Sequence, residues 1–257
     1  MAIRITSALR NYVLQNGSFK QSLQNGKIEI YTGTQPTTPE TAPTGSLLCT
    51  YTEASAAHTA EVLASGTVTL TTGASGSVNT VTVNGVNVLF AAVPYNASLN
   101  QTAADVAASI NEGLNDPEYT ATSAAAVVTI TATRGTGATP NTFVVSATLT
   151  TLTASFVNLA GGVTPVNGLR FGSAAAGSLA KRALQVWSGV AGATGTAGWF
   201  RFVGSVVDSN ALDGSEAQIR LDGSISTVGA DLNLSSTTIT ATATQTINSF
   251  TVTLPAA

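Results

Sequence analysis

The order of apolar and polar positions along this chain predicts mostly short β-strands. Residues 27–31 alternate, with Ile28 and Ile30 on one side of the strand, and residues 47–52 show the same period of two. Further strands are predicted at residues 66–71, 80–90, 126–133, 142–147, 152–159, 199–203, 218–221, 230–234, 239–243 and 249–254. We therefore predict a mainly β chain with short helices, in which the outer domain resembles a sandwich.

The first 45 residues have the features of a segment that docks on another protein. Ile5, Leu9 and Val13 are spaced four apart, which predicts that they share one face of one or two short amphipathic helices. Residues 33–45 follow the first strand as a polar arm with three prolines. We expect the helical segment and the arm to form an assembly interface. Its candidate residues are Ile5, Leu9, Val13, Gln35, Pro36, Pro39 and Pro43.

The centre of the chain combines strands with one helix. Residues 101–114 repeat apolar side chains every four positions, as expected for a helix that packs one face against a core. Thr102 is expected to cap its first turn, and Asp116–Pro117 to end it. The pair Asn84–Gly85 predicts a tight hairpin within residues 80–90, because both residue types tolerate a left-handed backbone.

Charge divides the chain into two parts. Residues 58–163 carry one basic and five acidic side chains, a net charge of −4, whereas the flanks carry nine basic and eight acidic ones, a net charge of +1. Both tryptophans also lie in the flanks. We therefore predict a small α+β module, residues 58–163, inserted into a discontinuous outer domain of residues 1–57 and 164–257, because exposed loops tolerate insertions. Two consecutive domains are the alternative.

The composition indicates a protein whose surface is covered by its neighbours. Charged residues make up 9% of the 257 residues, against roughly 25% in typical soluble domains. The many Thr, Val and Ser residues favour strands over disorder. Because a free monomer usually carries charges of both signs over its surface, so few charges favour assembly in multiple copies. A β-protein kept soluble by its surface hydroxyl groups is the alternative.

The sequence argues against several classes of partner. The ten basic side chains form no cluster that would follow a phosphate backbone, so we expect no nucleic-acid partner. The N-terminal residues lack the apolar core of a secretion signal, and no run of 18 apolar residues exists to span a membrane. We therefore expect a protein that is made in a cytoplasm, has no signal peptide and binds no membrane.

The reactive side chain types occur singly. His58 is the only histidine, has no thiol near it in the sequence, and is expected in a loop. Cys49 is the only cysteine, which excludes an internal disulfide, and its alternation with Leu47 places it in the core. The glycines of residues 134–141 lack the Lys-Ser/Thr pair of a phosphate-binding loop, so we expect a plain loop there.

Carboxylates are the remaining candidates for chemistry. A hydrolase or a calcium site would require Asp208 with Asp213 and Glu216, or Asp222 with Asp231. The Asp-Gly pairs at residues 213–214 and 222–223 are typical of turns instead, and the spacing of an EF-hand is missing. We therefore expect no enzymatic activity, no metal and no cofactor.

Two resemblances connect these observations. In the centre, VTVNGVNVLF, ADVAASINEGLN and YTATSAAAVVTITATRGTG resemble a small αβ module that recurs in phage tail proteins, flagellins and hook-associated proteins. The flanks resemble a family of tailed-bacteriophage virion proteins through SALRNYVLQNGSFKQSLQNGKIEIYTGTQPTTPETAPTGSLL, GTAGWFRFVGSVVDS, QIRLDGSIST and SFTVTLP. The first resemblance implies an exposed module without catalysis, and the second implies a component of the virion.

The resemblance to virion proteins implies copies of the chain itself and other virion proteins as partners. A collar or neck protein at the head-to-tail junction would bind the portal or the head–tail connector, and a capsid decoration protein would bind the major capsid protein. We expect the collar, because an amphipathic segment followed by a proline-rich arm suits docking on a neighbour. A glycan-binding adhesin, with Trp187, Trp199 and Tyr95 stacked on sugar rings, is a further alternative.

Overall fold

The computed structural model describes residues 3–113 and 119–253, and the predicted mainly β fold with short helices is confirmed. The chain forms two compact units. The outer unit contains residues 1–60 and 165–257, and the inserted unit contains residues 61–164. The boundaries predicted from charge lie within three residues of these. Each unit has a hydrophobic core of its own.

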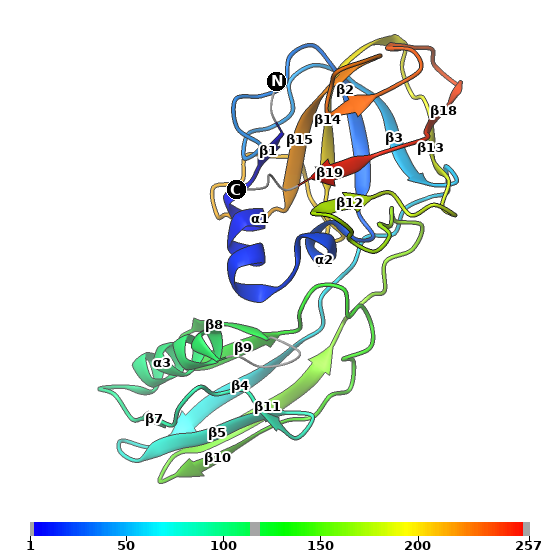
Figure 1. Ribbon diagram of the computed structural model, residues 1–257. Coiled ribbons are helices and arrows are strands. Elements are labelled where there is room, and N and C mark those ends of the chain that lie inside the picture. Colours follow the sequence, from blue (N-terminus) through cyan, green and yellow to red (C-terminus); the bar gives the residue numbers. More distant parts are fainter. Residues whose placement is uncertain (1–2, 114–118, 254–257) are drawn as a thin grey trace. The chain divides into compact units, whose positions relative to one another are not determined.

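The outer unit is built on one large sheet. Its strands are β1 (Arg4–Ile5), β2 (Lys27–Thr32), β3 (Leu47–Glu53), β12 (Ser178–Ala180), β13 (Trp187–Val190), β14 (Gly195–Val203), β15 (Arg220–Ser226), β16 (Leu232–Asn233), β17 (Thr238–Ile239), β18 (Thr244–Ile247) and β19 (Thr251–Thr253). Nine of them form the sheet, in the order β1–β15–β14–β2–β3–β13–β18 with β16 beside β15 and β17 beside β14 (Figure 1). The strands β12 and β19 form a separate pair.

The core of the outer unit is rich in aromatic rings. Phe171 stacks on Phe202 with ring centroids 5.5 Å apart, and its edge meets Trp187 at 5.5 Å. Phe250, just before β19, contacts the edge of Phe200 at 5.6 Å. Each aromatic side chain buries a large apolar surface. These contacts therefore hold the segments around Phe171 and Phe250, which precede β12 and β19, against the rings of β13 and β14.

Short helices follow β1 at the start of the outer unit. They are α1 (Ser7–Asn11), the π-helix η1 (Tyr12–Asn16) and α2 (Phe19–Leu23). Thr6 caps α1, its hydroxyl accepting a hydrogen bond from the Leu9 amide at 3.3 Å, so Ile5 lies in β1 and not in a helix. Leu9 is buried, whereas Val13 is 39% exposed. The predicted single helix face is therefore wrong, because the cap and the π-helix turn these side chains in different directions.

The inserted unit has two four-stranded sheets and one longer helix. Its elements are β4 (Ser65–Thr72), β5 (Ser77–Val83), β6 (Val86–Asn87), β7 (Val93–Pro94), α3 (Leu99–Glu112), β8 (Thr120–Ala124), β9 (Val127–Thr131), β10 (Val145–Thr150) and β11 (Thr153–Ala160). The sheet orders are β11–β4–β9–β8 and β10–β5–β6 with β7 beside β5. Between β5 and β6, Asn84 and Gly85 have φ values of 50° and 83°, which confirms the predicted hairpin.

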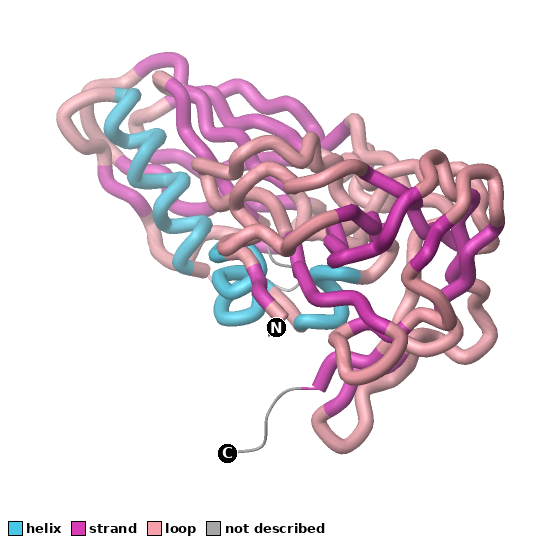
Figure 2. The backbone as a smooth tube through the Cα atoms, turned by 90° about the horizontal axis from the view of Figure 1, so that it is seen from above, coloured by secondary structure: helices cyan, strands magenta, loops and turns pink. Residues whose placement is uncertain are grey.

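The helix α3 covers the sheet that contains β8 and β9 (Figure 2). It begins at Leu99, two residues before the predicted start, and its cap is Ser98, whose hydroxyl accepts a hydrogen bond from the Gln101 amide at 3.1 Å. The predicted cap, Thr102, is wrong, because its hydroxyl donates to the Ser98 carbonyl within the first turn. The predicted end at Asp116–Pro117 lies outside the described residues.

Candidate functional site

The two most reactive side chain types have structural roles. Cys49 is 2% exposed in β3, as predicted, and burial raises the pKa of its thiol to about 11. A thiol that stays protonated at neutral pH is a poor nucleophile. His58 lies in a loop, also as predicted, and its Nε2 is 3.0 Å from the Asn25 carbonyl oxygen. Burial lowers the pKa of His58 below its ordinary value, so the ring is a neutral hydrogen-bonding group at neutral pH.

This pKa predicts how the outer unit responds to acid. With the folded-state pKa of His58 below 6.5, the unfolded chain takes up a proton that the folded chain does not. The free energy of unfolding is therefore expected to be highest above the unfolded-state pKa and to fall as the pH drops from about 7.5 to about 5.5. Urea denaturation followed by tryptophan fluorescence reports on the outer unit alone, which holds both tryptophans. In His58→Asn this pH dependence should disappear, and an unchanged slope would contradict the assignment.

The glycine-rich loop after β9 binds a carboxylate of the same chain. The main-chain amides of Gly135 and Gly137 donate to one oxygen of Glu61 at 2.8 and 2.9 Å, and Glu61 is fully buried. The predicted loop is confirmed, and its inward amides already have an acceptor. This arrangement fixes the loop and leaves those two amides unavailable to a phosphate.

The carboxylates of residues 208–216 are also engaged. Both oxygens of Asp208 accept hydrogen bonds from the Arg220 guanidinium at 2.6 Å, and both side chains are about 1% exposed. Asp213 accepts from the main-chain amides four and five residues later, at 3.1 and 2.8 Å. Burial alone would raise the pKa of Asp213, but these hydrogen bonds and the nearby arginine lower it. Glu216 accepts from the side chain amide of Asn11 at 3.2 Å.

The second carboxylate pair is held in place as well. Asp222 lies within β15 and accepts two hydrogen bonds of 2.8 Å from Arg201, with both side chains fully buried. The predicted turn at residues 222–223 is therefore wrong, because this Asp-Gly pair belongs to a strand. Asp231 accepts from the amide and the hydroxyl of Ser224 at 2.8 and 2.7 Å. Among residues 3–113 and 119–253, no three His, Cys, Asp or Glu side chains are grouped as metal ligands would be.

The proline-rich arm, residues 33–45, is bound to the sheet of its own unit. Arg201, Arg220, Arg4 and Trp199 donate side chain hydrogen bonds to its main-chain carbonyl groups. Arg201 donates to the Thr41 carbonyl at 3.1 Å, and Arg220 donates to the Pro39 carbonyl at 3.0 Å. Arg4 donates to the Pro36 carbonyl, and Trp199 donates to the Thr44 carbonyl at 3.2 Å. Because the two buried arginines also bind Asp222 and Asp208, the arm and the sheet form one network of hydrogen bonds. We call residues 33–45 the clamped arm.

Within the clamped arm, the predicted interface residues are mostly covered. Gln35, Pro36 and Pro39 are buried, and Pro43 is half-buried. The Gln35 side chain is 4% exposed, and its amide finds no hydrogen-bond partner among the described residues. It lines a hollow of about 570 Å³ with Thr34, Pro36, Thr37, Thr41, Ala42 and Thr44. An unpaired buried amide destabilises the fold by about 1–3 kcal/mol for each unpaired group, which makes this the least satisfied part of the arm.

In the N-terminal segment, the exposed apolar side chains are one predicted interface residue, Val13, and its neighbour Leu14. Leu9 packs into the core of the outer unit, and Ile5 is half-buried against that core. Val13 is 39% exposed and its neighbour Leu14 is 85% exposed. An intermolecular contact through this segment would therefore involve Val13 and Leu14, and the interface itself stays a prediction.

The aromatic residues of the glycan-binding alternative do not form an exposed platform. Trp187 and Trp199 are fully buried. Trp199 stacks on Tyr31 with ring centroids 4.7 Å apart, and Trp187 donates its Nε1–H to Gln185 at 2.7 Å. Tyr95 is half-buried, with its hydroxyl donating to the carbonyl two residues later at 3.1 Å. Neither tryptophan is placed to stack on a sugar ring, which leaves this alternative without its main binding groups.

No helix among the described residues is long and apolar enough to cross a membrane. The sequence matches no protein-family model and no curated protein at a significant level. The resemblance to tailed-phage virion proteins therefore remains a prediction from the residues quoted above.

Proposed function

We propose that the protein is a non-enzymatic structural protein that assembles in multiple copies. The observation that carries this proposal is the exposure of large aliphatic side chains on a chain with few charges. In the outer unit, Leu14, Leu184 and Leu212 are 85%, 91% and 71% exposed. Charged residues, which keep monomers apart, are only 9% of the sequence. The carboxylates of the functional-site candidates accept hydrogen bonds within the chain, and the Cys49 thiol is buried. Both observations also favour a structural role.

The proposed location is the virion of a tailed phage, most specifically a collar at the head-to-tail junction. This part of the proposal is supported by the resemblance of the flanking sequences and by the apolar N-terminal segment. The neighbours would be further copies of the chain and the portal or head–tail connector. The buried unpaired amide of Gln35 supports a role for the clamped arm, since groups that lack partners in a free protein are frequently used in its complexes.

Cryo-electron microscopy of intact particles tests the proposed location. A ring of copies at the head-to-tail junction is the expected result. Copies spread over the capsid lattice would overturn the collar and identify a capsid decoration protein. Particles that contain the chain at no position would overturn the virion proposal as a whole.

The exposed N-terminal leucine provides a test of the assembly contact. Burying a leucine side chain contributes about 1.5–3 kcal/mol, which corresponds to roughly ten- to hundredfold in affinity. Leu14→Glu is therefore expected to weaken incorporation into particles by at least about tenfold, measured by quantitative mass spectrometry of purified particles. The melting temperature should not change, because Leu14 is 85% exposed.

Val86→Glu is the matched control for this variant. Val86 is 48% exposed in the inserted unit, so the substitution adds the same charge at a position outside the proposed contact. It should leave incorporation unchanged. Equal incorporation of Leu14→Glu and wild type would rule out the N-terminal segment as a contact.

A further inference from the structure

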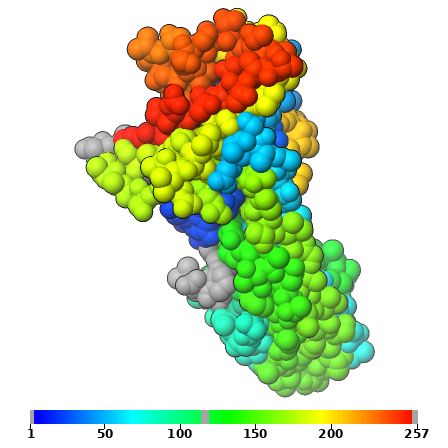
Figure 3. Space-filling view, turned by 90° about the vertical axis from the view of Figure 1, so that its right-hand side faces the viewer, coloured from blue at the N-terminus to red at the C-terminus, as the bar shows by residue number. Residues whose placement is uncertain are grey.

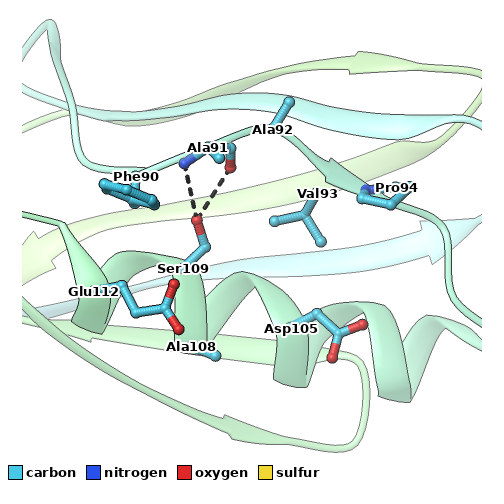
Figure 4. Close-up of a pocket in the computed structure, with 9 residues that line it drawn as sticks. All are labelled: Phe90, Ala91, Ala92, Val93, Pro94, Asp105, Ala108, Ser109 and Glu112. Atoms are coloured by element: carbon cyan, nitrogen blue, oxygen red, sulfur yellow. Dashed lines mark hydrogen bonds between the residues drawn. The ribbon is translucent and has the colours of Figure 1, made fainter.

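A hollow of about 280 Å³ lies between α3 and the segment before and within β7 in the inserted unit. Figure 4 shows that its lining comes from residues 90–94 on one side and from α3 on the other. Phe90 at its edge is 69% exposed. The Ser109 hydroxyl bonds the main-chain nitrogen of Ala91 at 3.3 Å and its carbonyl oxygen at 3.0 Å. The hollow is thus held in shape by main-chain contacts, and its size suits a few side chains rather than a drug-sized ligand.

The rim of this hollow is acidic. Asp105 and Glu112 are seven residues apart on α3, which places both carboxylates on one helix face (Figure 4). Asp105 accepts hydrogen bonds from Asn96 and Gln101 at 2.8 and 2.9 Å. Glu112 is exposed and forms no ion pair or hydrogen bond with the described residues. With a net charge of −4 on residues 61–164, the inserted unit attracts a basic and partly apolar group to this rim.

The outer unit presents a turn with these properties. Within residues 182–186, Arg182 is exposed, Leu184 is 91% exposed and Val186 is 53% exposed. The Arg182 side chain forms no ion pair with any described residue. In the space-filling view, the yellow-green to yellow segment near residues 170–190 lies on the surface beside the red C-terminal strands (Figure 3).

The side chain of Gln185 holds the turn in place through three hydrogen bonds. The Gln185 side chain is 4% exposed and receives hydrogen bonds from Trp187 Nε1 and the Arg170 amide at 2.7 and 2.6 Å. It donates to the Gly168 carbonyl at 2.9 Å. A second anchor is the Lys181 ammonium, which donates to the Gln185 carbonyl at 2.5 Å. A turn that is already ordered loses little conformational entropy on binding, which favours its use as a contact.

We propose that the turn of residues 182–186 from one copy docks in the acidic hollow of a second copy. Leu184 would contact Phe90 and Ala108, and the Arg182 guanidinium would pair with Glu112. This inference rests on the proposed function, because it names the contact between copies. The turn and the hollow are different surfaces, so the contact runs head to tail and generates a ring when the rotation between copies closes.

Charge reversal in the full-length chain tests this contact. Self-association of the wild type is measured by analytical ultracentrifugation over a concentration series. Glu112→Lys and Arg182→Glu, each alone, place like charges against each other and should weaken self-association by at least about tenfold. The double variant restores opposite charges and should return to within about threefold of the wild type. Ser155→Lys, on the exposed strand β11 of the same unit, is the control and should associate like the wild type.

The outcomes separate the contact from the proposed function. If the wild type associates and both single variants associate equally well, the docking contact is wrong while multi-copy assembly stands. Weakened single variants without recovery in the double variant also overturn the contact. A wild type that stays monomeric at all concentrations overturns the contact, and if particles also do not contain the chain, the proposed function is overturned as well. Thermal unfolding of every variant should match the wild type, since Glu112 and Arg182 are exposed.

Discussion

Asp222→Asn is expected to lower the free energy of unfolding of the outer unit by about 3–5 kcal/mol. The substitution keeps the shape of the side chain but removes the charge that balances Arg201, and both side chains are fully buried. The guanidinium group of an arginine keeps its proton in proteins, so it cannot become neutral when its partner is removed. The buried guanidinium would therefore remain charged without a counter-ion. Urea denaturation followed by tryptophan fluorescence measures the loss.

Two further variants separate the charge effect from simple loss of contacts. Asp231→Asn removes a carboxylate that accepts from Ser224 without a buried arginine partner, and we expect a loss of about 1 kcal/mol. Arg201→Met with Asp222→Leu removes both charges and should recover most of the stability. The double variant also removes the shorter of the two arginine hydrogen bonds to the Thr41 carbonyl, so the clamped arm should exchange its amide hydrogens faster. A double variant as unstable as Asp222→Asn would contradict the explanation by an unpaired charge.

Gln185→Leu is expected to destabilise the outer unit by about 3 kcal/mol, because it leaves two buried groups and one part-buried group without partners, at about 1–3 kcal/mol for each buried group. These are the Trp187 indole N–H, the Arg170 amide and the Gly168 carbonyl. Loss of the indole hydrogen bond should also shift the Trp187 fluorescence. The free energy of unfolding is measured by urea denaturation.

Gln245→Leu is the matched control for the Gln185 variant. Gln245 lies in β18 of the same unit, and its side chain makes no hydrogen bond to the described residues. We expect a change within about 0.5 kcal/mol. Similar losses in both variants would show that the three hydrogen bonds of Gln185 do not matter for stability. A loss confined to Gln185 would also predict weaker docking of the turn, because its anchor is gone.

Some strands were predictable from the alternation of apolar and polar residues. The pattern of residues 27–31 and 47–52 predicts strands, and these residues lie in β2 and β3. Ile28 and Ile30 enter the hydrophobic core as the alternation predicts, but Glu29 and Tyr31 on the other face of β2 are buried too. The Asn84–Gly85 hairpin was predictable because its left-handed backbone restricts the residue types. The strand β8 was missed: its sequence TATSA is short and mostly exposed, so alternation does not mark it. The start of α3 was misplaced because two hydroxyl residues compete as caps in one turn.

The contacts around the clamped arm were not predictable in the same way. Arg201 was visible only as one polar residue in an alternating strand, and Asp222 as half of a turn-like Asp-Gly pair. Their bidentate contact depends on the pairing of β14 with β15, which brings residues 201 and 222 opposite each other. The carbonyl groups that the arginines bind belong to the main chain and leave no mark in the residue types. A single sequence therefore predicts a polar arm but not what holds it.

The division of the outer unit between the two ends of the chain has a consequence during synthesis. On the ribosome, β2 and β3 emerge before the whole inserted unit, whereas β14, the second neighbour of β2 in the sheet, comes more than 160 residues later. At synthesis rates of about 5–20 residues per second, β2 waits roughly ten to thirty seconds for this partner. The inserted unit, which is continuous, has all its strands by residue 160 and is expected to fold during that interval. During this interval, the early apolar strands are the part of the nascent chain most prone to aggregation and to chaperone binding. The low charge of the sequence increases that tendency.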